Sequence, residues 1–104
     1  MFFPKTRADI VARIINSRPN KNCVASGYRP AFKIRTDYLT TGVIKLIGQE
    51  ELAHGDEGMA EIWFITPEYY PHCLEVGQTI QFQEGAIIHG YIEVVQINNK
   101  QLEK

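Results

Sequence analysis

Short runs of β-branched and aromatic residues, separated by turn-forming residues, recur along this chain of 104 residues. The breaks fall at Gly, Pro, Asn and Asp, which favour turns because they adopt backbone conformations that other residues avoid. The runs between the breaks have the length and composition of strands, without a helical period. They predict six strands, near residues 8–17, 28–36, 42–47, 58–66, 79–84 and 86–97. Six short strands favour an all-β barrel or sandwich, and closure into a barrel would remove exposed strand edges.

Two of these segments need a closer look. Residues 8–17 also fit an amphipathic helix, but their β-branched content and the stop at Arg18-Pro19 favour a strand. The last two strands form a hairpin around Glu84-Gly85, where glycine can take the positive φ of a tight turn.

The strand at 58–66 departs from simple alternation, because both of its faces are largely apolar around Trp63. In a lone barrel, the outward set of apolar side chains would be an exposed patch, and such patches often mark an interface. Alternatively, loops of the same chain cover Trp63 and its neighbours. The pattern leaves both readings open.

Composition fits a single domain, with the barrel at about 8–97 and short tails at both ends. A chain of ~100 residues buries roughly two-thirds of its unfolded surface, which is enough for one core. A net charge of -1 and a pI near 6.3 argue against a generically basic nucleic-acid binder. No apolar run approaches the ~20 residues of a membrane span, and Pro4-Lys5 follow the first apolar residues too soon for a secretory signal. We therefore expect a cytoplasmic protein that does not bind membranes.

Motifs of catalysis are missing from the sequence. It has neither a phosphate-binding glycine loop nor a Gly-x-Ser-x-Gly elbow, so we expect no bound nucleotide and no serine nucleophile. The histidines at 54, 72 and 89 are widely separated, and the two cysteines, Cys23 and Cys73, lack metal-ligand spacing. The prediction is a protein that is not an enzyme and that has no catalytic residues, metal or cofactor.

Charge is distributed unevenly along the chain. Residues 1–45 carry nine basic side chains against two acidic ones, whereas residues 46–104 carry ten acidic against two basic. The halves therefore have net charges of +7 and -8. Such asymmetry suggests one surface for an anionic ligand and another for a cationic one, unless interleaved strands mix the two sets.

Two groups of residues are candidates for binding. The basic candidates for holding phosphates are Arg18, Lys21, Arg29 and Lys33. The candidates for contacting a protein partner combine acidic residues with aromatic anchors, which interfaces favour. They are Asp56, Glu57, Glu61, Trp63, Glu68, Tyr69 and Tyr70.

The segment Gly27-Tyr28-Arg29-Pro30-Ala31-Phe32 resembles the Gly-Tyr-Arg-Pro-x-Phe segment in the third, C-terminal β-barrel domain of bacterial elongation factor Tu. The similarity continues in order through Arg35-Thr36, Thr41-Gly42, Gly55-Asp56, Thr66-Pro67 and the hairpin 82–85, and ends at His89-Gly90. It covers roughly residues 8–97. The resemblance implies a closed six-stranded antiparallel barrel.

In that family the third domain contacts the T-stem of aminoacyl-tRNA and packs against the GTPase domain. By resemblance, Thr41, Glu84 and Gly85 match positions that touch the T-stem. The chain departs from the family at Ala31, where the family has Gln, and at Thr66, where it has a basic or polar residue. The Arg-His pair that the family carries in the preceding loop reads here as Arg18-Pro19-Asn20. Because GTPase motifs are lacking as well, we expect binding without a delivery cycle.

Three functions follow from these expectations. The first is a non-catalytic mimic of the factor's third domain, in concrete form an immunity protein that occludes a toxin directed at the translation machinery. The second is a module that binds the acceptor or T-arm of tRNA through the basic half. The third is a regulator that docks on the factor's GTPase domain. A protein partner is the leading expectation, with tRNA as the alternative.

Overall fold

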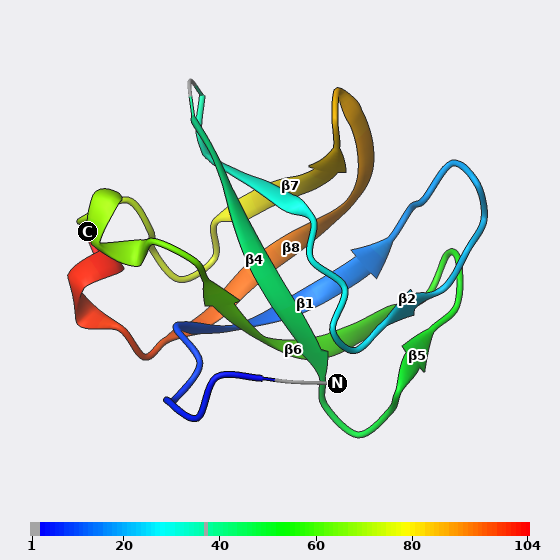
Figure 1. The fold of residues 1–104 in the computed structure, drawn as a ribbon, viewed down its shortest axis with the longest axis horizontal. Helices are drawn as coiled ribbons and strands as arrows, with labels where there is room; N and C mark the ends of the chain where they lie inside the picture. The colour runs from blue at the N-terminus through cyan, green and yellow to red at the C-terminus, as the bar shows by residue number, and fades with distance from the viewer. Residues whose placement is uncertain (1–2, 37) are drawn as a thin grey trace.

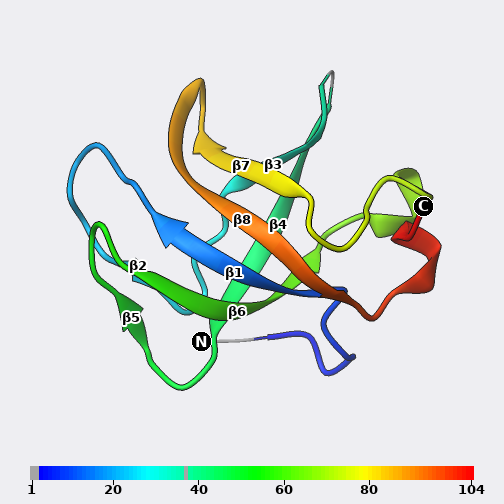
Figure 2. The same ribbon diagram turned by 180° about the vertical axis from the view of Figure 1, so that it is seen from behind.

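The computed structural model describes residues 3–36 and 38–104, and these form a closed antiparallel barrel (Figures 1 and 2). The order around the barrel is β1-β6-β4-β3-β7-β8, and every neighbouring pair is antiparallel. This confirms the predicted all-β, six-stranded barrel. Its strands are β1 (Ile10–Asn16), β3 (Ala31–Arg35), β4 (Tyr38–Leu46), β6 (Glu57–Phe64), β7 (Thr79–Glu84) and β8 (Ile87–Ile97).

The core lies inside the barrel and is built from every second residue of each strand, because successive side chains of a strand point to opposite faces. On β1, for example, Ile10, Ala12 and Ile14 are fully buried. The rings of Phe32, Phe64 and Phe82 meet in the centre, with Phe32 5.6 Å from Phe64 and 6.0 Å from Phe82 between ring centroids.

The strand limits differ from prediction where a glycine was taken for a break. Gly42 lies inside β4, whose nine residues begin four positions before the predicted start. A Cβ at Gly42 would stand 2.9 Å from the Phe32 ring, so this glycine makes room for a core aromatic rather than a turn. Gly90 does the same inside β8, where a Cβ would overlap the Phe82 ring and the Ile15 carbonyl.

Short elements close the two ends of the barrel. At one end, β2 (Val24–Ala25) and β5 (Glu51–Leu52) pair in a small sheet that the sequence pattern did not predict. At the other end lie two 3₁₀ helices, η1 (Pro67–Tyr69) and η2 (Lys100–Leu102). Leu102 is fully buried, so the short C-terminal tail contributes a side chain to the core. No helix formed by residues 3–36 and 38–104 is both long enough and apolar enough to cross a membrane.

The N-terminal segment crosses the outside of β6 and covers its apolar outward side. The Trp63 indole N–H donates to the Thr6 carbonyl at 2.9 Å, and the Phe3 ring lies 5.9 Å from the Trp63 ring. Ala8 and Val43 complete this second, smaller apolar cluster. Trp63 is therefore 8% exposed, which decides between the two readings of this strand in favour of cover by the chain itself.

Candidate functional site

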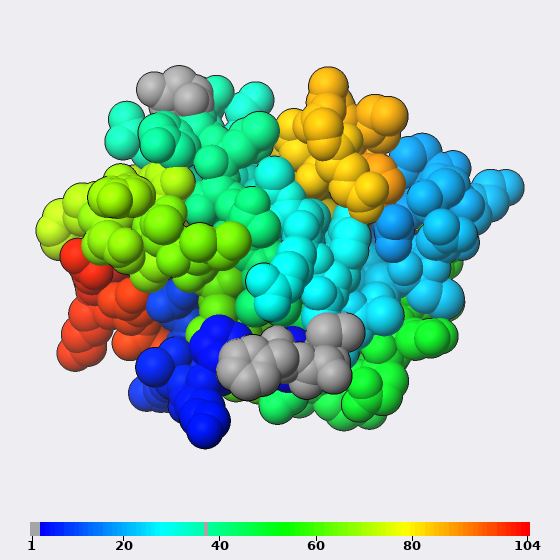
Figure 3. Space-filling model, viewed as in Figure 1, coloured from blue at the N-terminus to red at the C-terminus, as the bar shows by residue number. Residues whose placement is uncertain are grey.

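The residues singled out by the resemblance lie in one row across three strands. Thr41 of β4 pairs with Ala31 of β3, and Ala31 pairs on its other side with Gln83 of β7. Glu84 and Gly85 follow Gln83 at the start of the hairpin to β8. The ladder thus brings Thr41 within two strands of Gln83, while Glu84, which alternates with Gln83, turns its side chain to the barrel mouth, where Tyr28 and His89 lie. We call the outward side chains of β3, β7 and the first half of β4 the β3 face, which Figure 3 shows from the front.

Glu84 does not stand alone at the end of this row. One oxygen of its carboxylate, Oε2, lies 3.1 Å from a terminal guanidinium nitrogen of Arg18 and accepts a 2.6 Å hydrogen bond from the Tyr28 hydroxyl. The Nδ1 of His89 lies 3.4 Å from the same oxygen. The Glu84 side chain nevertheless remains 45% exposed. It therefore presents an acceptor to solvent while a neighbouring cation balances its charge.

Arg18 is the centre of this cluster. Its side chain is 14% exposed, its Nε donates to His89 Nδ1 at 3.2 Å, and a terminal nitrogen donates to the Cys23 carbonyl at 2.8 Å. Its guanidinium carbon also lies 4.8 Å from the centroid of the Tyr28 ring, a cation–π distance. Because the Nε–H donates to Nδ1, the His89 ring accepts at that nitrogen.

Burial and the adjoining Glu84 carboxylate raise the pKa of the Tyr28 hydroxyl well above its usual value of 10.0. Burial disfavours the phenolate, and the hydrogen bond to Glu84 requires the proton. The opposing effect of Arg18 is smaller. Tyr28 is thus a permanent hydrogen-bond donor to Glu84 at neutral pH.

The loop that carries Arg18 is fixed by a buried amide. Asn16 is fully buried, and its side-chain N–H groups donate to the carbonyls of Asn22 at 3.0 Å and Leu52 at 2.9 Å. Its side-chain oxygen accepts from the Arg18 backbone N–H at 3.0 Å. The side-chain amide of Asn16 therefore holds β1, the loop and β5 together, which preorganises Arg18 toward Glu84.

Outward charges differ sharply between the two sides of the barrel. Among the described residues, the outward positions of β3 and β7 hold Lys33 and Arg35 but no acid before Glu84. On the opposite side, Glu57 and Glu61 of β6 point outward with Trp63, and Arg13 of β1 pairs with Glu93 of β8 at 3.1 Å. Lys45 lies opposite Glu61 across β4 and β6. Strand order therefore sets acids beside bases around β6, whereas the charged outward residues of β3 and β7 in the described part of the chain are Lys33 and Arg35.

The other basic candidates border the β3 face. Lys33 is exposed and lies two residues beyond Ala31 on the same side of β3. Arg29 is exposed and lines a hollow of about 230 Å³ together with Thr41 and Val43. Lys21 is exposed in the loop that carries Arg18, with φ 61°.

The residues expected to contact a protein partner are not brought together. Asp56 and Glu57 lie where the 53–56 loop meets the end of β1, with the Asp56 carbonyl accepting from Asn16 N–H. Glu61 lies on β6, and Glu68 and Tyr69 lie in η1. The set occupies separate parts of the surface.

Two of the expected anchors are corrected by the structure. Trp63 is buried under the N-terminal segment, and Tyr70 is 4% exposed, with its ring 4.9 Å from that of Tyr38. Both rings hold the chain's own segments in place and are not available to a partner. Tyr69, in contrast, is 68% exposed.

Sequence reasoning missed three members of the site. Tyr28 and His89 entered the sequence analysis only as parts of the segments that resemble elongation factor Tu. In the structure, His89 contacts Arg18 and Tyr28 contacts Glu84. Gln83 was also missed; its amide donates to the Gly85 carbonyl at 2.7 Å and accepts from Gln81 at 2.8 Å. The signal available for Gln83 was its place one residue before Glu84 on an outward position of a predicted strand.

Comparison of the chain with family models and with curated proteins finds no match. Within residues 3–36 and 38–104, no group of three or more His, Cys, Asp or Glu side chains is placed to hold a metal ion. The geometry of the β3 face is therefore the main guide to the function of the chain.

Proposed function

We propose that this protein binds the helical stem of a structured RNA, such as the T-arm or acceptor arm of tRNA, through its β3 face. The observation that carries the proposal is the row Thr41, Ala31, Gln83, Glu84 across three strands, bordered by Arg29 and Lys33. The ordered motifs that resemble elongation factor Tu domain 3 support the same assignment.

The chemistry of this row suits a double-stranded RNA. A-form RNA presents 2′-hydroxyls and phosphates across a wide, shallow minor groove, and proteins recognise it mainly by shape. Thr41 supplies a hydroxyl, and the exposed oxygen of Glu84 can accept from a 2′-hydroxyl. A carboxylate near phosphates is normally repelled, but Arg18 at 3.1 Å balances that of Glu84. Lys33 and Arg29 supply charge for the phosphates. The proposal includes a cytoplasmic location, as the sequence analysis expects.

The test is binding of a short RNA hairpin of T-stem length, measured by fluorescence anisotropy at several salt concentrations. A DNA hairpin of the same sequence is the control for the 2′-hydroxyls. We expect tighter binding of the RNA, and a slope of log affinity against log salt of roughly -2 to -3, from two or three phosphate contacts.

Matched variants locate the contact. Lys33→Gln lies on the β3 face and should weaken binding by about fivefold, whereas Lys100→Gln in η2 removes the same charge elsewhere and should leave binding unchanged. Equal binding of RNA and DNA hairpins, or equal losses in the two variants, would contradict the proposal.

A second candidate function is that of a mimic of elongation factor Tu domain 3. In this case the protein is an immunity protein that binds a toxin which recognises the factor. The observation that favours it is a pair of exposed apolar side chains before and within η1, Ile65 at 61% and Tyr69 at 68% exposure. Aromatic anchors of this kind carry much of the energy of protein interfaces. A toxin-capture assay in which Tyr69→Ala abolishes binding and Lys33→Gln does not would favour this candidate over RNA.

A further inference from the structure

Strands β3 and β7 pair over two residues and then part. Ala31 pairs with Gln83 and Phe32 with Phe82, and the ladder between the described residues of the two strands ends there. From Thr79 to Gln81, β7 pairs with β8 alone. The register of β3 with β4 also jumps from Phe32 to Arg35. Two strand edges, at residues 33–36 and 78–81, therefore face each other without a ladder between them. We call this opening the seam.

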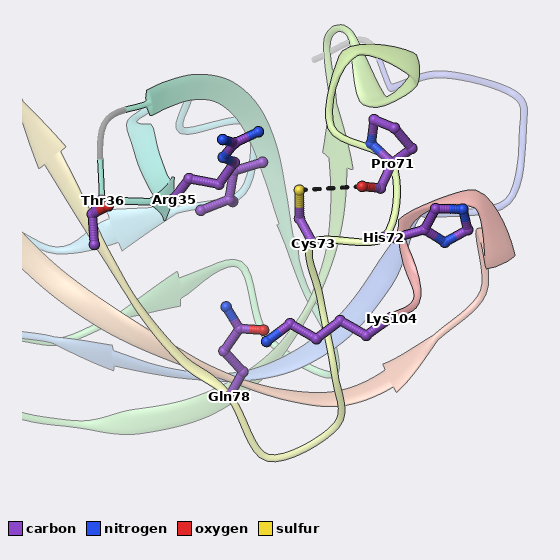
Figure 4. Close-up of a pocket in the computed structure, with 8 residues that line it drawn as sticks. Arg35, Thr36, Pro71, His72, Cys73, Gln78 and Lys104 are labelled. Atoms are coloured by element: carbon purple, nitrogen blue, oxygen red, sulfur yellow. Dashed lines mark hydrogen bonds between the residues drawn. The ribbon is translucent and has the colours of Figure 1, made fainter.

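Two hollows occupy the seam. One, of about 640 Å³, and another, of about 340 Å³, share the lining residues Ile34, Arg35, Thr36 and Gln78. The larger hollow continues to His72, Cys73 and Lys104, which Figure 4 shows around a common space. The smaller one continues along β7 to Gln81. Together they form a groove that follows the seam.

The floor of the groove is closed, so it is a surface site and not an entrance to the core. Ile34, which lines both hollows, is 4% exposed and belongs to the same buried core cluster as Ile80 and Leu74. Exposed strand edges present unpaired N–H and C=O groups that readily accept a further strand. Barrels normally remove such edges by closing, and in this closed barrel the ladder between the described residues of β3 and β7 spans only two residue pairs.

The molecule already shows strand-like pairing at one end of the seam. Leu74 and Glu103 form a parallel bridge, with Leu74 N–H donating to the Leu102 carbonyl and Lys104 N–H to the Leu74 carbonyl, each at 2.8 Å. The extended C-terminal segment thus pairs with the loop that borders the larger hollow. This pairing shows that extended chain fits at this end of the barrel.

The side chains around the seam indicate the chemistry of an occupant. Lys33 and Arg35 alternate with buried Ile34 on the β3 edge, and Lys104 adds a cation at the far end, where Glu75 lies 3.4 Å from it. Thr79 and Gln81 on the β7 edge are uncharged. Phe, Tyr and Trp are absent from the described lining of both hollows, and His72 supplies the one aromatic ring there, which argues against successive stacked bases of single-stranded nucleic acid.

We propose that the seam binds an extended acidic peptide by strand addition. Carboxylates at alternate positions of the peptide would lie beside Lys33 and Arg35, because side chains directly across neighbouring strands pair on one face. The residues between them would face Ile34 and Pro71, which favours small apolar side chains. Backbone hydrogen bonds to the two edges supply affinity, as in other peptides recognised by added strands.

The binding experiment uses a fluorescein-labelled peptide, Glu-Val-Glu-Val-Glu, and two controls. Glu-Pro-Glu-Pro-Glu keeps the three carboxylates but loses two backbone N–H groups, and Lys-Val-Lys-Val-Lys reverses the charge. We expect the first peptide alone to bind. Lys33→Gln should weaken its binding by about fivefold, and Lys45→Gln, at an exposed lysine near the C-terminal end of β4, should not. Equal binding of the proline peptide would overturn strand addition.

Two further readouts locate the bound peptide and remain valid if a variant is unstable. Cys23→Ser leaves Cys73 as the only cysteine of the chain, and the peptide should slow alkylation of that thiol at least severalfold. Amide hydrogen exchange should slow at residues 33–36 and 78–81. Peptide binding without protection of these amides would overturn the proposal. So would protection by an RNA hairpin and not by the peptide, which would assign the seam to RNA.

Discussion

Two outward surfaces of the same barrel show what the chain does with positions that do not face the core. On β6, the outward residue Trp63 is 8% exposed because the N-terminal segment covers it. On β3, the outward residue Lys33 is exposed, and polar side chains continue from it to β7. We call the covered surface, with Trp63, Val43 and Ala8, the β6 face.

The difference follows from which groups each face carries. The β6 face combines apolar side chains with acids that basic neighbours offset, such as Lys45 opposite Glu61. Among the described residues, the β3 face has a basic and polar surface, and the Glu84 carboxylate at its end is balanced by Arg18. Burying an apolar side chain is favourable and burying an unpaired charge is not. The chain therefore covers the first face itself, and the second face remains open to solvent.

Removal of Trp63 should have the largest effect. Trp63→Ala creates a void under the N-terminal segment and removes the donor to the Thr6 carbonyl, so we expect a loss of about 3 kcal/mol in the free energy of unfolding. Tyr69→Ala, at an aromatic residue that is 68% exposed, should change it by less than about 0.5 kcal/mol. Urea unfolding followed by circular dichroism measures both. Similar losses in the two variants would remove the distinction between covered and open aromatics.

Asp9 is expected to give the next largest effect, because it joins the N-terminal segment to both β6 and the C-terminal segment. Its carboxylate accepts from the Phe64 N–H at 2.7 Å and from the Asn99 amide at 3.0 Å, and Asp9 is 9% exposed. Asp9→Ala leaves a buried N–H without its acceptor and should cost about 2 kcal/mol. Asp56→Ala, at an exposed carboxylate, should be neutral within about 0.5 kcal/mol in the same urea assay. A neutral Asp9→Ala would show that the segment covers β6 without this clamp.

The six strands could be predicted because local alternation and turn residues mark each strand, whichever strand it pairs with, although β1 pairs with the distant β6 and β8. The prediction failed at Gly42, where the requirement for glycine comes from the Phe32 ring across the ladder rather than from a turn. The cover of Trp63 could not be predicted, because the hydrogen bond from Trp63 to Thr6 spans 57 positions of the chain.

The candidate site could be predicted only in part, because its contacts also join residues that lie far apart in the sequence. The resemblance named Thr41, Glu84 and Gly85, and basic charge named Arg18, but no local pattern joins Arg18 to Glu84 across 66 residues. Their contact depends on the closed barrel, which brings the loop after β1 to the β7–β8 hairpin. The acidic candidates failed to gather because their separate loops lie at different ends of the barrel.

The cluster of Arg18 and Glu84 can be tested by a double-mutant cycle on RNA binding. Arg18→Gln leaves the Glu84 carboxylate without its cation, and we expect affinity for the RNA hairpin to fall about tenfold. In the double variant with Glu84→Gln, the repulsion of phosphates is removed and part of the loss should be recovered. Arg7→Gln, at an exposed cation of the N-terminal segment, is the matched control and should be silent. Additive effects of the two substitutions would show that charge balance at Glu84 does not govern binding.

The smallest effect is expected from Tyr28 and appears only at alkaline pH. Burial and Glu84 hold the Tyr28 pKa above its ordinary value of 10.0 in the folded chain, so above pH 10 the unfolded chain loses this proton while the folded chain keeps it. The unfolded state then binds fewer protons, and stability falls as pH rises through that range, whereas this group adds no pH dependence near neutral pH. Tyr28→Phe removes the titrating group together with the 2.6 Å bond to Glu84. Urea midpoints at pH 9, 10 and 11 should therefore decline more steeply in the wild type than in Tyr28→Phe. Parallel declines would mean that folding does not hold the phenolic proton of Tyr28, and that its hydrogen bond does not orient Glu84.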